Sequence, residues 1–270
     1  MKIILLGCTI SLALLILGGC QKVIHLDLGS SDPRYVVEGI LTDQKGTCKV
    51  LISRTKAFDD DNSFQGVSGA EVKLAAGGDT TLLKETEPGV YVDSLMTGSP
   101  GHTYSLSVTV EGHVFTATST MPRRVGIDSA YVAEESPYGE PVKQMNVVYK
   151  DPAGEANYYK FVEFVNGVQV PQLFVSDDQL QDGKKVTATL RYYDDQGDEN
   201  DMPEIKSGDT VRVQMQCIDK AVYKYWSSME SSATGTNQSA SPANPVSNLT
   251  GGALGYFSAY TLEQKQVIAP

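Results

Sequence analysis

The stretch "TYSLSVTVEGHVFTATST", residues 103–120, contains the clearest structural signal in the chain. Two runs, 103–110 and 113–120, alternate between apolar and polar side chains, which is typical of strands with one buried face. Glu111-Gly112 separates the runs at the spacing of a two-residue hairpin loop. The stretch therefore predicts an antiparallel β-hairpin that packs one face on a core.

The residues before this hairpin continue the same alternation. Turn signals rich in Gly, Pro and Asp separate short runs that we expect to be strands, and about seven short strands within about ninety residues favour an immunoglobulin-like β-sandwich. We place this sandwich at residues 34–121. The runs are 34–42, 48–55, 70–76 and 89–95.

The segment Met121-Pro122-Arg123-Arg124 predicts a boundary, and the second domain is expected at 125–264. In residues 219–232 the apolar side chains recur with the period of a helix, and Asp219 is a plausible N-cap. We therefore expect a β-rich domain with one helix and a long polar loop at 231–250. Its expected strands are 126–135, 143–150, 157–167, 185–194, 209–219 and 251–262.

The N-terminal residues 1–19 carry one charge, Lys2, followed by an apolar run. The run is shorter than the ~20 residues of a membrane-spanning helix and is typical of a secretory signal peptide. It ends in Leu17-Gly18-Gly19-Cys20, which resembles a bacterial lipobox. We expect the Cys20 thiol to take up a diacylglyceryl group as a thioether, with acyl chains such as palmitate, followed by cleavage before Cys20 and a tether at 20–33. The alternative is an ordinary signal peptide with a chance cysteine.

Two or more acyl chains anchor a protein stably, so we expect a domain tethered to a membrane. Gln21 and Lys22 follow the cysteine in place of an acidic cluster, and this leaves the membrane face, extracellular or periplasmic, open. The formal net charge of −11 argues against nucleic acid as a partner, because affinity for phosphates comes from Lys and Arg.

Two cysteines remain after the leader and the acylated residue are set aside. Cys48 and Cys217 each alternate in phase with apolar neighbours, so both should point toward a core. We expect buried free thiols. The alternative is a disulfide that crosses between the two halves of the chain.

The sequence contains no recognisable catalytic motif. It has three histidines, at 25, 102 and 113, and neither Gly-x-Ser-x-Gly nor His-Glu-x-x-His. A pair of glycosidase carboxylates has no positive support. We therefore expect a protein without enzymatic activity and without a cofactor, and a hydrolase is the least supported alternative.

Two acidic runs are weak candidates for a calcium site, because hard cations need several converging oxygens. Solvated loops are the alternative, since neither run has the spacing of an EF-hand. The first is Asp59-Asp60-Asp61-Asn62. The stronger candidate contains Asp194, Asp195, Asp198, Glu199 and Asp201.

Tyrosine is abundant, with 14 residues, and is concentrated in the second half of the chain. A tyrosine buries its ring while its hydroxyl finds a polar partner, which suits protein interfaces. Core packing explains about half of these residues, because neighbouring side chains of a strand face opposite sides. Tyr158 and Tyr193 are our candidates for a partner surface.

Several stretches, taken in order, resemble the outer-membrane lipoproteins of domain of unknown function 4249. They are "HLDL" (25–28) after Cys20, "DPRYVVEGILT" (32–42), "VSGAEVKL" (67–74), "PGVYVDSLMTGSPGHTYSLSV" (88–108), "FTATSTMP" (115–122), "IDS" (127–129) and "SNLTGGALGYFSAY" (247–260). The resemblance implies a lipid anchor in the outer membrane and a gene often beside that of a TonB-dependent receptor. It supplies no catalytic residues.

These observations lead to one expected function and one alternative. We expect a non-enzymatic accessory lipoprotein that associates with a TonB-dependent transporter in nutrient uptake. The alternative is a free-standing surface lipoprotein that binds a ligand or a glycan, or is adhesive.

Overall fold

The computed structural model describes residues 32–56, 63–135, 141–190, 204–233 and 244–270. Pro33–Pro270 cluster as one compact unit. This unit is mainly β, with three sheets and, among the described residues, one helix. The predicted fold class, sandwich-like and β-rich with one helix, is confirmed.

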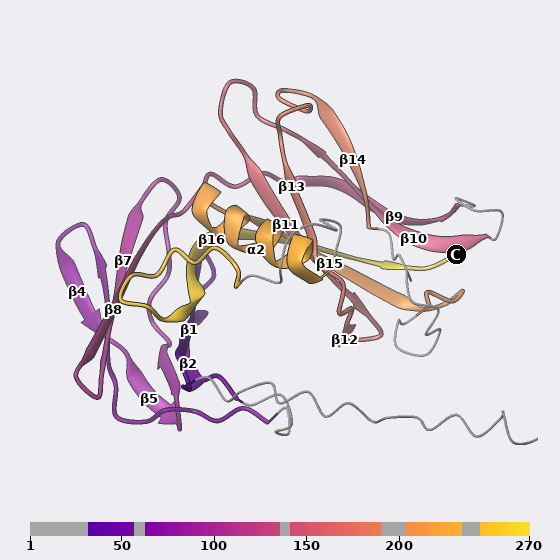
Figure 1. The fold of residues 1–270 in the computed structure, drawn as a ribbon. Coiled ribbons are helices and arrows are strands. Elements are labelled where there is room, and N and C mark those ends of the chain that lie inside the picture. Colours follow the sequence, from indigo (N-terminus) through magenta and orange to yellow (C-terminus); the bar gives the residue numbers. More distant parts are fainter. Residues whose placement is uncertain (1–31, 57–62, 136–140, 191–203, 234–243) are drawn as a thin grey trace, which may run out of the picture. The chain divides into compact units, whose positions relative to one another are not determined.

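The elements fall into two groups along the chain (Figure 1). The N-terminal group contains β1 (Tyr35–Thr42), β2 (Cys48–Arg54), β3 (Glu71–Ala76), β4 (Asp79–Leu82), β5 (Lys84–Glu87), β6 (Val90–Asp93), β7 (Thr103–Val110) and β8 (His113–Thr120). The C-terminal group contains β9 (Ile127–Glu135), β10 (Val142–Lys150), β11 (Tyr158–Val165), β12 (Val168–Gln169), β13 (Phe174–Asp177), β14 (Lys185–Leu190), β15 (Thr210–Cys217), α2 (Lys220–Ala233) and β16 (Leu254–Ile268).

One nine-stranded sheet runs through both groups in the order β12-β11-β15-β16-β1-β2-β6-β5, with β13 also paired to β11. Its β1 side packs against the sheet β4-β3-β7-β8 around a first hydrophobic core. Its β11 side packs against the sheet β14-β10-β9 around a second core. We call these two packed regions the N-terminal half and the C-terminal half.

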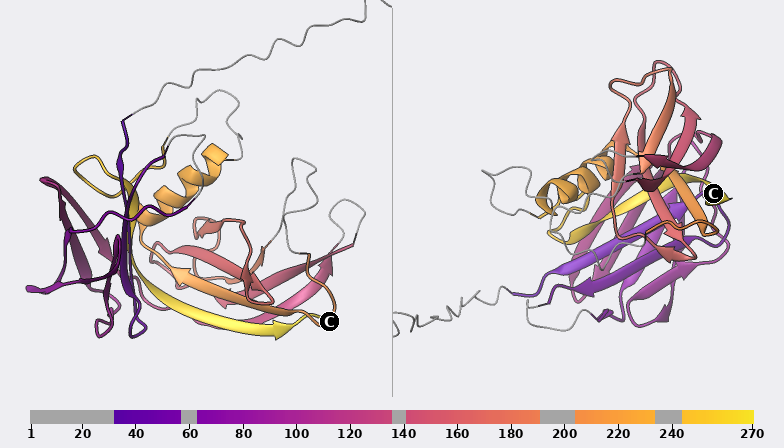
Figure 2. Two further views of the ribbon diagram at one scale, coloured as in Figure 1. Left: turned by 90° about the horizontal axis from the view of Figure 1, so that it is seen from below. Right: turned by 90° about the vertical axis from the view of Figure 1, so that its right-hand side faces the viewer.

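The last strand, β16, belongs to both halves. It pairs in parallel with β1 from Val36↔Leu254 to Thr42↔Tyr260, and then antiparallel with β15 as far as Thr210↔Ile268. Figure 2 (left) shows it as one long curved strand. Phe257 is buried in the first core. The division into domains at 34–121 and 125–264 stays a prediction.

The hairpin predicted at Glu111-Gly112 is confirmed. β7 and β8 pair up to Val110↔His113, and the two turn residues have φ of 49° and 80°. Positive φ at both loop positions is the geometry that matches the twist of the flanking strands. Glycine accepts it without strain.

Gly255 shows why a glycine-rich segment precedes the final strand. Its φ is 95°, and an added Cβ would lie 2.1 Å from the carbonyl oxygen of Val37. A side chain at this position would therefore separate β16 from β1.

The helix α2 begins after Asp219, as predicted. The Asp219 Oδ1 atom accepts a hydrogen bond from the Val222 amide at 2.9 Å, which is the contact of an N-cap. Its Oδ2 atom accepts hydrogen bonds from the Ser119 hydroxyl and from the Thr120 amide. The start of α2 is therefore held against the end of β8, while the helix packs on β11, β13 and β16.

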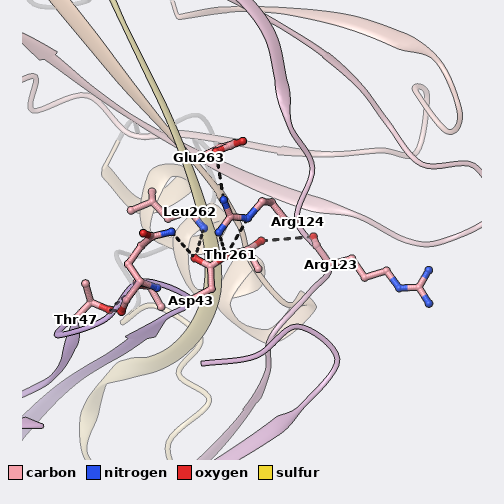
Figure 3. A network of polar contacts seen from close by, with 9 residues as sticks. Asp43, Thr47, Arg123, Arg124, Thr261, Leu262 and Glu263 are labelled. Atoms are coloured by element: carbon pink, nitrogen blue, oxygen red, sulfur yellow. Dashed lines mark hydrogen bonds and ion pairs between the residues drawn. The ribbon is translucent and has the colours of Figure 1, made fainter. Parts of the chain in front are cut away.

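A polar network joins the two halves where β16 passes from one to the other (Figure 3). Asp43, just after β1, pairs with the guanidinium of Arg124 and accepts a hydrogen bond from the Leu262 amide at 3.1 Å. Arg124 also lies 3.5 Å from Glu263. The Asp43 side chain is only 6% exposed, whereas the Arg124 side chain is 41% exposed, so the carboxylate is buried while its guanidinium partner reaches solvent.

The sequence did not predict β4, β5, β12, β13 or the last part of β16. These segments are short or polar, and all four residues of β5 are exposed. These segments therefore lack the alternation of apolar and polar residues that predicts a strand. Only their hydrogen-bonded pairing with neighbouring strands identifies them as strands. Among the described residues, no helix has the length and apolar content needed to cross a membrane.

Cys48 and Cys217, the cysteines that the structure describes, are buried free thiols, as expected. Cys48 lies in the first core and Cys217 in the second. Burial raises the pKa of the Cys48 thiol to about 12 and also raises that of Cys217. Neither thiol is therefore activated as a nucleophile.

Candidate functional site

Three aspartates meet at one end of the C-terminal half. Asp151 directly follows β10, and Asp178 and Asp182 lie in the loop between β13 and β14. The antiparallel pairing of β10 with β14 brings these segments together, and the Asp151 amide continues it by donating to the Lys184 carbonyl at 2.9 Å. The two loops lie at the top of Figure 1.

The three carboxylates converge closely. One oxygen from each lies within 4.8 Å of the others. Asp151 is 1% exposed and Asp178 is 7% exposed, whereas Asp182 faces solvent. Buried carboxylates at this separation need donors or a cation to compensate their loss of hydration.

Only uncharged donors reach these carboxylates in the part of the chain that the structure describes. Asp151 accepts from the Tyr159 hydroxyl and from the Gly183 amide at 3.2 Å. The Asn157 amide donates to Asp178 at 2.9 Å, and the Gly154 amide donates to Asp182 at 2.7 Å. No described Lys, Arg or His forms an ion pair with any of the three.

Two further polar atoms beside the cluster are buried and have no hydrogen-bond partner. They are the hydroxyl oxygen of Tyr149 and the amide oxygen of Gln181. Burial raises the pKa of Tyr149, and the negative charges of Asp151 and Asp178 raise it further. The Tyr149 ring lies 4.8 Å from that of Tyr159, centroid to centroid.

A cavity of about 330 Å³ is lined by Tyr149 and Gln181, the two residues just described beside the cluster, and not by the three aspartates themselves. Tyr149 and Gln181 line it on one side, together with apolar side chains from the segment before β13 and from β14. Glu230 of α2 also lines the cavity, and burial raises its pKa. The cavity therefore combines apolar walls with a few polar groups, as binding sites for small molecules do.

A second group of interest lies beneath α2. The Lys160 ammonium sits 3.6 Å from the centroid of the Trp226 ring, a cation–π contact. Burial lowers the pKa of Lys160 to about 8, while the nearby Glu38 carboxylate opposes this shift. A structural role explains this half-buried lysine, since the helix covers it.

Tyr158 is the one candidate site residue from the sequence that the structure describes. It is half-buried, and its ring lies 5.0 Å from that of Tyr223 on α2. Its role in a partner surface stays a prediction. The other candidates lie outside the described residues: Cys20, Tyr193, Asp194, Asp195, Asp198, Glu199, Asp201 and the run 59–62.

The aspartate cluster was not predicted, because its members come from two loops far apart in the sequence. Each loop does carry a local signal. Asp151 stands directly after a predicted strand, and Asp178 is followed by Asp182-Gly183, a spacing that places two carboxylates in one tight turn. Neither signal alone distinguishes a binding loop from a solvated turn.

The fold and this site define a mainly β protein with two cores between sheets, a smaller hydrophobic cluster beneath α2, a shared final strand and an acidic loop cluster. The chain belongs to the family described as Domain of unknown function (DUF4249), whose model matches residues 21–266. Comparison with curated proteins found no match.

Proposed function

We propose that the protein is a lipid-anchored outer-membrane accessory protein that works beside a TonB-dependent transporter and has no catalytic activity of its own. The observation that carries the proposal is the leader, in which an apolar run ends in Leu17-Gly18-Gly19-Cys20. The proposal of a transporter partner rests on the resemblance to the family of outer-membrane lipoproteins. Either face of the membrane is compatible with it.

The proposed mechanism is one of tethering. Acyl chains on Cys20 would hold the β unit at the membrane, where its effective concentration near a barrel is high. A modest docking contact then suffices for stable association, because the second binding step is intramolecular.

A pull-down tests the proposal. The natively tagged lipoprotein is recovered from detergent-solubilised outer membrane and its partners are identified by mass spectrometry. We expect a TonB-dependent barrel in stoichiometric amount. The Cys20→Ser variant serves as the matched control, and we expect it to lose both membrane fractionation and the barrel. A lipoprotein recovered without any barrel would refute the transporter partnership.

The cavity favours a second candidate function, capture of a small ligand. Tyr149 and Gln181 both line it, and the hydroxyl oxygen of the first and the amide oxygen of the second are buried without partners, so a ligand that donates hydrogen bonds, such as a glycan hydroxyl or a peptide amide, would satisfy them. Native mass spectrometry against glycan and peptide mixtures is the test. We expect binding to be lost in Gln181→Leu and kept in Gln179→Leu, an exposed residue of the same loop. Equal binding by both variants would contradict this role.

A further inference from the structure

We propose that Asp151, Asp178 and Asp182 bind a calcium ion. The site is distinct from the acidic run at 194–201. The proposal goes beyond the accessory function, since it holds whether or not a transporter is the partner.

The separation of the carboxylate oxygens fits one calcium ion. Oxygens bound to calcium at roughly 2.3–2.6 Å can lie up to about 5 Å apart, on opposite sides of the ion. One oxygen from each of the three aspartates lies within 4.8 Å of the other two. A single ion is therefore within reach of all three carboxylates.

Burial and charge favour a cation at this place. Asp151 and Asp178 are almost completely buried, and the groups that donate to them are a tyrosine hydroxyl and backbone amides. Two buried negative charges beside a third repel one another and have lost their hydration, and both effects destabilise the ionised cluster. A divalent cation compensates both effects at once.

The Tyr149 hydroxyl is an independent indication of a ligand. Tyr149 is 0% exposed, and its hydroxyl oxygen is buried without a hydrogen-bond partner. Tyr149 precedes Asp151 by two positions, so both side chains leave the same face of the chain. Calcium commonly retains water among its ligands, and such a water can donate a hydrogen bond to this oxygen.

The ligand chemistry selects a hard cation. All three side chains offer carboxylate oxygens, whereas zinc and copper favour nitrogen and sulfur donors. The two histidines that the structure describes, His102 and His113, lie in the N-terminal half. Calcium accepts irregular geometry from flexible loops, while magnesium requires a near-ideal octahedron.

A bound ion would also shape the cavity. It would join the loop after β10 to the loop between β13 and β14, and the latter carries Gln181 of the cavity wall. Calcium would thereby hold the mouth of the cavity in one conformation. The same ion would stabilise the folded chain, because it binds the native arrangement and not the unfolded one.

The test uses the full chain, stripped with a chelator and then titrated with calcium or magnesium while thermal unfolding and binding heat are measured. We expect calcium in the millimolar range to raise Tm and magnesium to do so less. The variants are Asp182→Asn, which removes the exposed ligand, and Asp128→Asn, an exposed aspartate of β9 in the same half, as the matched control. We expect the calcium-induced shift to be lost in the first and kept in the second.

A second measurement distinguishes the loss of a calcium ligand from a folding defect of the variant. In the chelated protein we expect Asp178→Asn to raise Tm, because it removes a buried repulsive charge; a purely structural hydrogen-bonding role would lower Tm. Absence of binding heat and of a Tm shift with calcium, or an equal response to magnesium, would overturn the assignment. So would a calcium shift that persists in Asp182→Asn. The pull-down of the transporter is read separately, so failure of one proposal is distinguishable from failure of the other.

Discussion

The buried tyrosines of the two halves differ in what their hydroxyls contact. In the N-terminal half the Tyr91 hydroxyl accepts from the Ala70 amide at 2.9 Å, and the Tyr104 hydroxyl accepts from the Ser99 amide at 2.7 Å. In the C-terminal half the Tyr159 hydroxyl donates to Asp151, and that of Tyr149 has no partner. The hydroxyls of Tyr91 and Tyr104 accept hydrogen bonds from main-chain amides, whereas those of Tyr159 and Tyr149 lie beside the acidic cluster.

Buried acidic residues follow the same division. Among the described residues, the acidic residues that are less than a tenth exposed as whole residues are Asp151, Glu163 and Asp178, and all lie in the C-terminal half; the buried Asp43 side chain lies at the junction, paired with Arg124. Buried polar groups that are fully satisfied stabilise a fold, while unsatisfied ones and converging charges point to a ligand. The N-terminal half therefore behaves as a scaffold, and the C-terminal half holds the candidate chemistry.

The largest effect is expected from Phe257→Ala. Phe257 is fully buried in the first core although it comes from the last strand, so its truncation should lower the free energy of unfolding by about 3–5 kcal/mol. Denaturant unfolding, followed by circular dichroism, measures this loss. Because β16 serves both cores, we expect one cooperative transition, and two separate transitions would show that the halves unfold independently. Tyr131→Ala, at an exposed position of β9, is the control.

A smaller loss is expected from Asp43→Ala at the junction of the halves. The change leaves the Leu262 amide without its acceptor and removes the partner of Arg124, at a cost of about 1–3 kcal/mol. Arg123→Ala is a matched control, because the Arg123 side chain is 77% exposed in its pair with Glu155. We expect thermal unfolding to separate the two variants clearly. Equal Tm values would mean that the junction contributes nothing to stability.

The next effect concerns the start of the helix. Asp219→Ala removes the N-cap of α2 and its contacts with Ser119 and Thr120, and should lower the free energy of unfolding by about 1 kcal/mol. Asp219→Asn keeps a capping oxygen and should lose less. Chemical denaturation of the two variants in parallel measures the difference. A larger loss in the asparagine variant would contradict the capping role.

The last prediction concerns the protonation of Lys160 and is measured by fluorescence and by stability. Trp226 is the single tryptophan, and Lys160 lies over its ring, so tryptophan fluorescence should change with a midpoint near pH 8, where Lys160 loses its proton. The folded pKa lies below that of a free lysine, so the unfolded chain binds more protons above about pH 8. The contribution of Lys160 to stability should therefore rise with pH through this range and level off near the pKa of free lysine.

Lys160→Met provides the control for this titration. It should abolish the fluorescence change near pH 8, and any stability it gains over the natural chain at neutral pH should diminish as the pH rises. An unchanged titration in the variant would assign the midpoint to another group.

Local features of this fold were predictable because their causes are local. Glu111-Gly112 predicts the hairpin through its backbone preference, and Asp219 predicts the helix start through a contact within one turn. The strand β5 escaped prediction since all its side chains are exposed and only its pairing with β6 defines it. The prediction that Cys48 and Cys217 are buried thiols succeeded because alternation reports burial directly.

The amino-acid sequence by itself determined the strands with one buried face, the hairpin turn, the capped helix and the membership of a family. Tertiary structure alone decided that β16 completes two cores and that Asp151 meets Asp178 and Asp182. The physical reason is that alternation, turn preference and capping act between neighbours in the chain. Strand order and the convergence of charges depend on pairing between segments far apart in the sequence, which only the folded chain brings together.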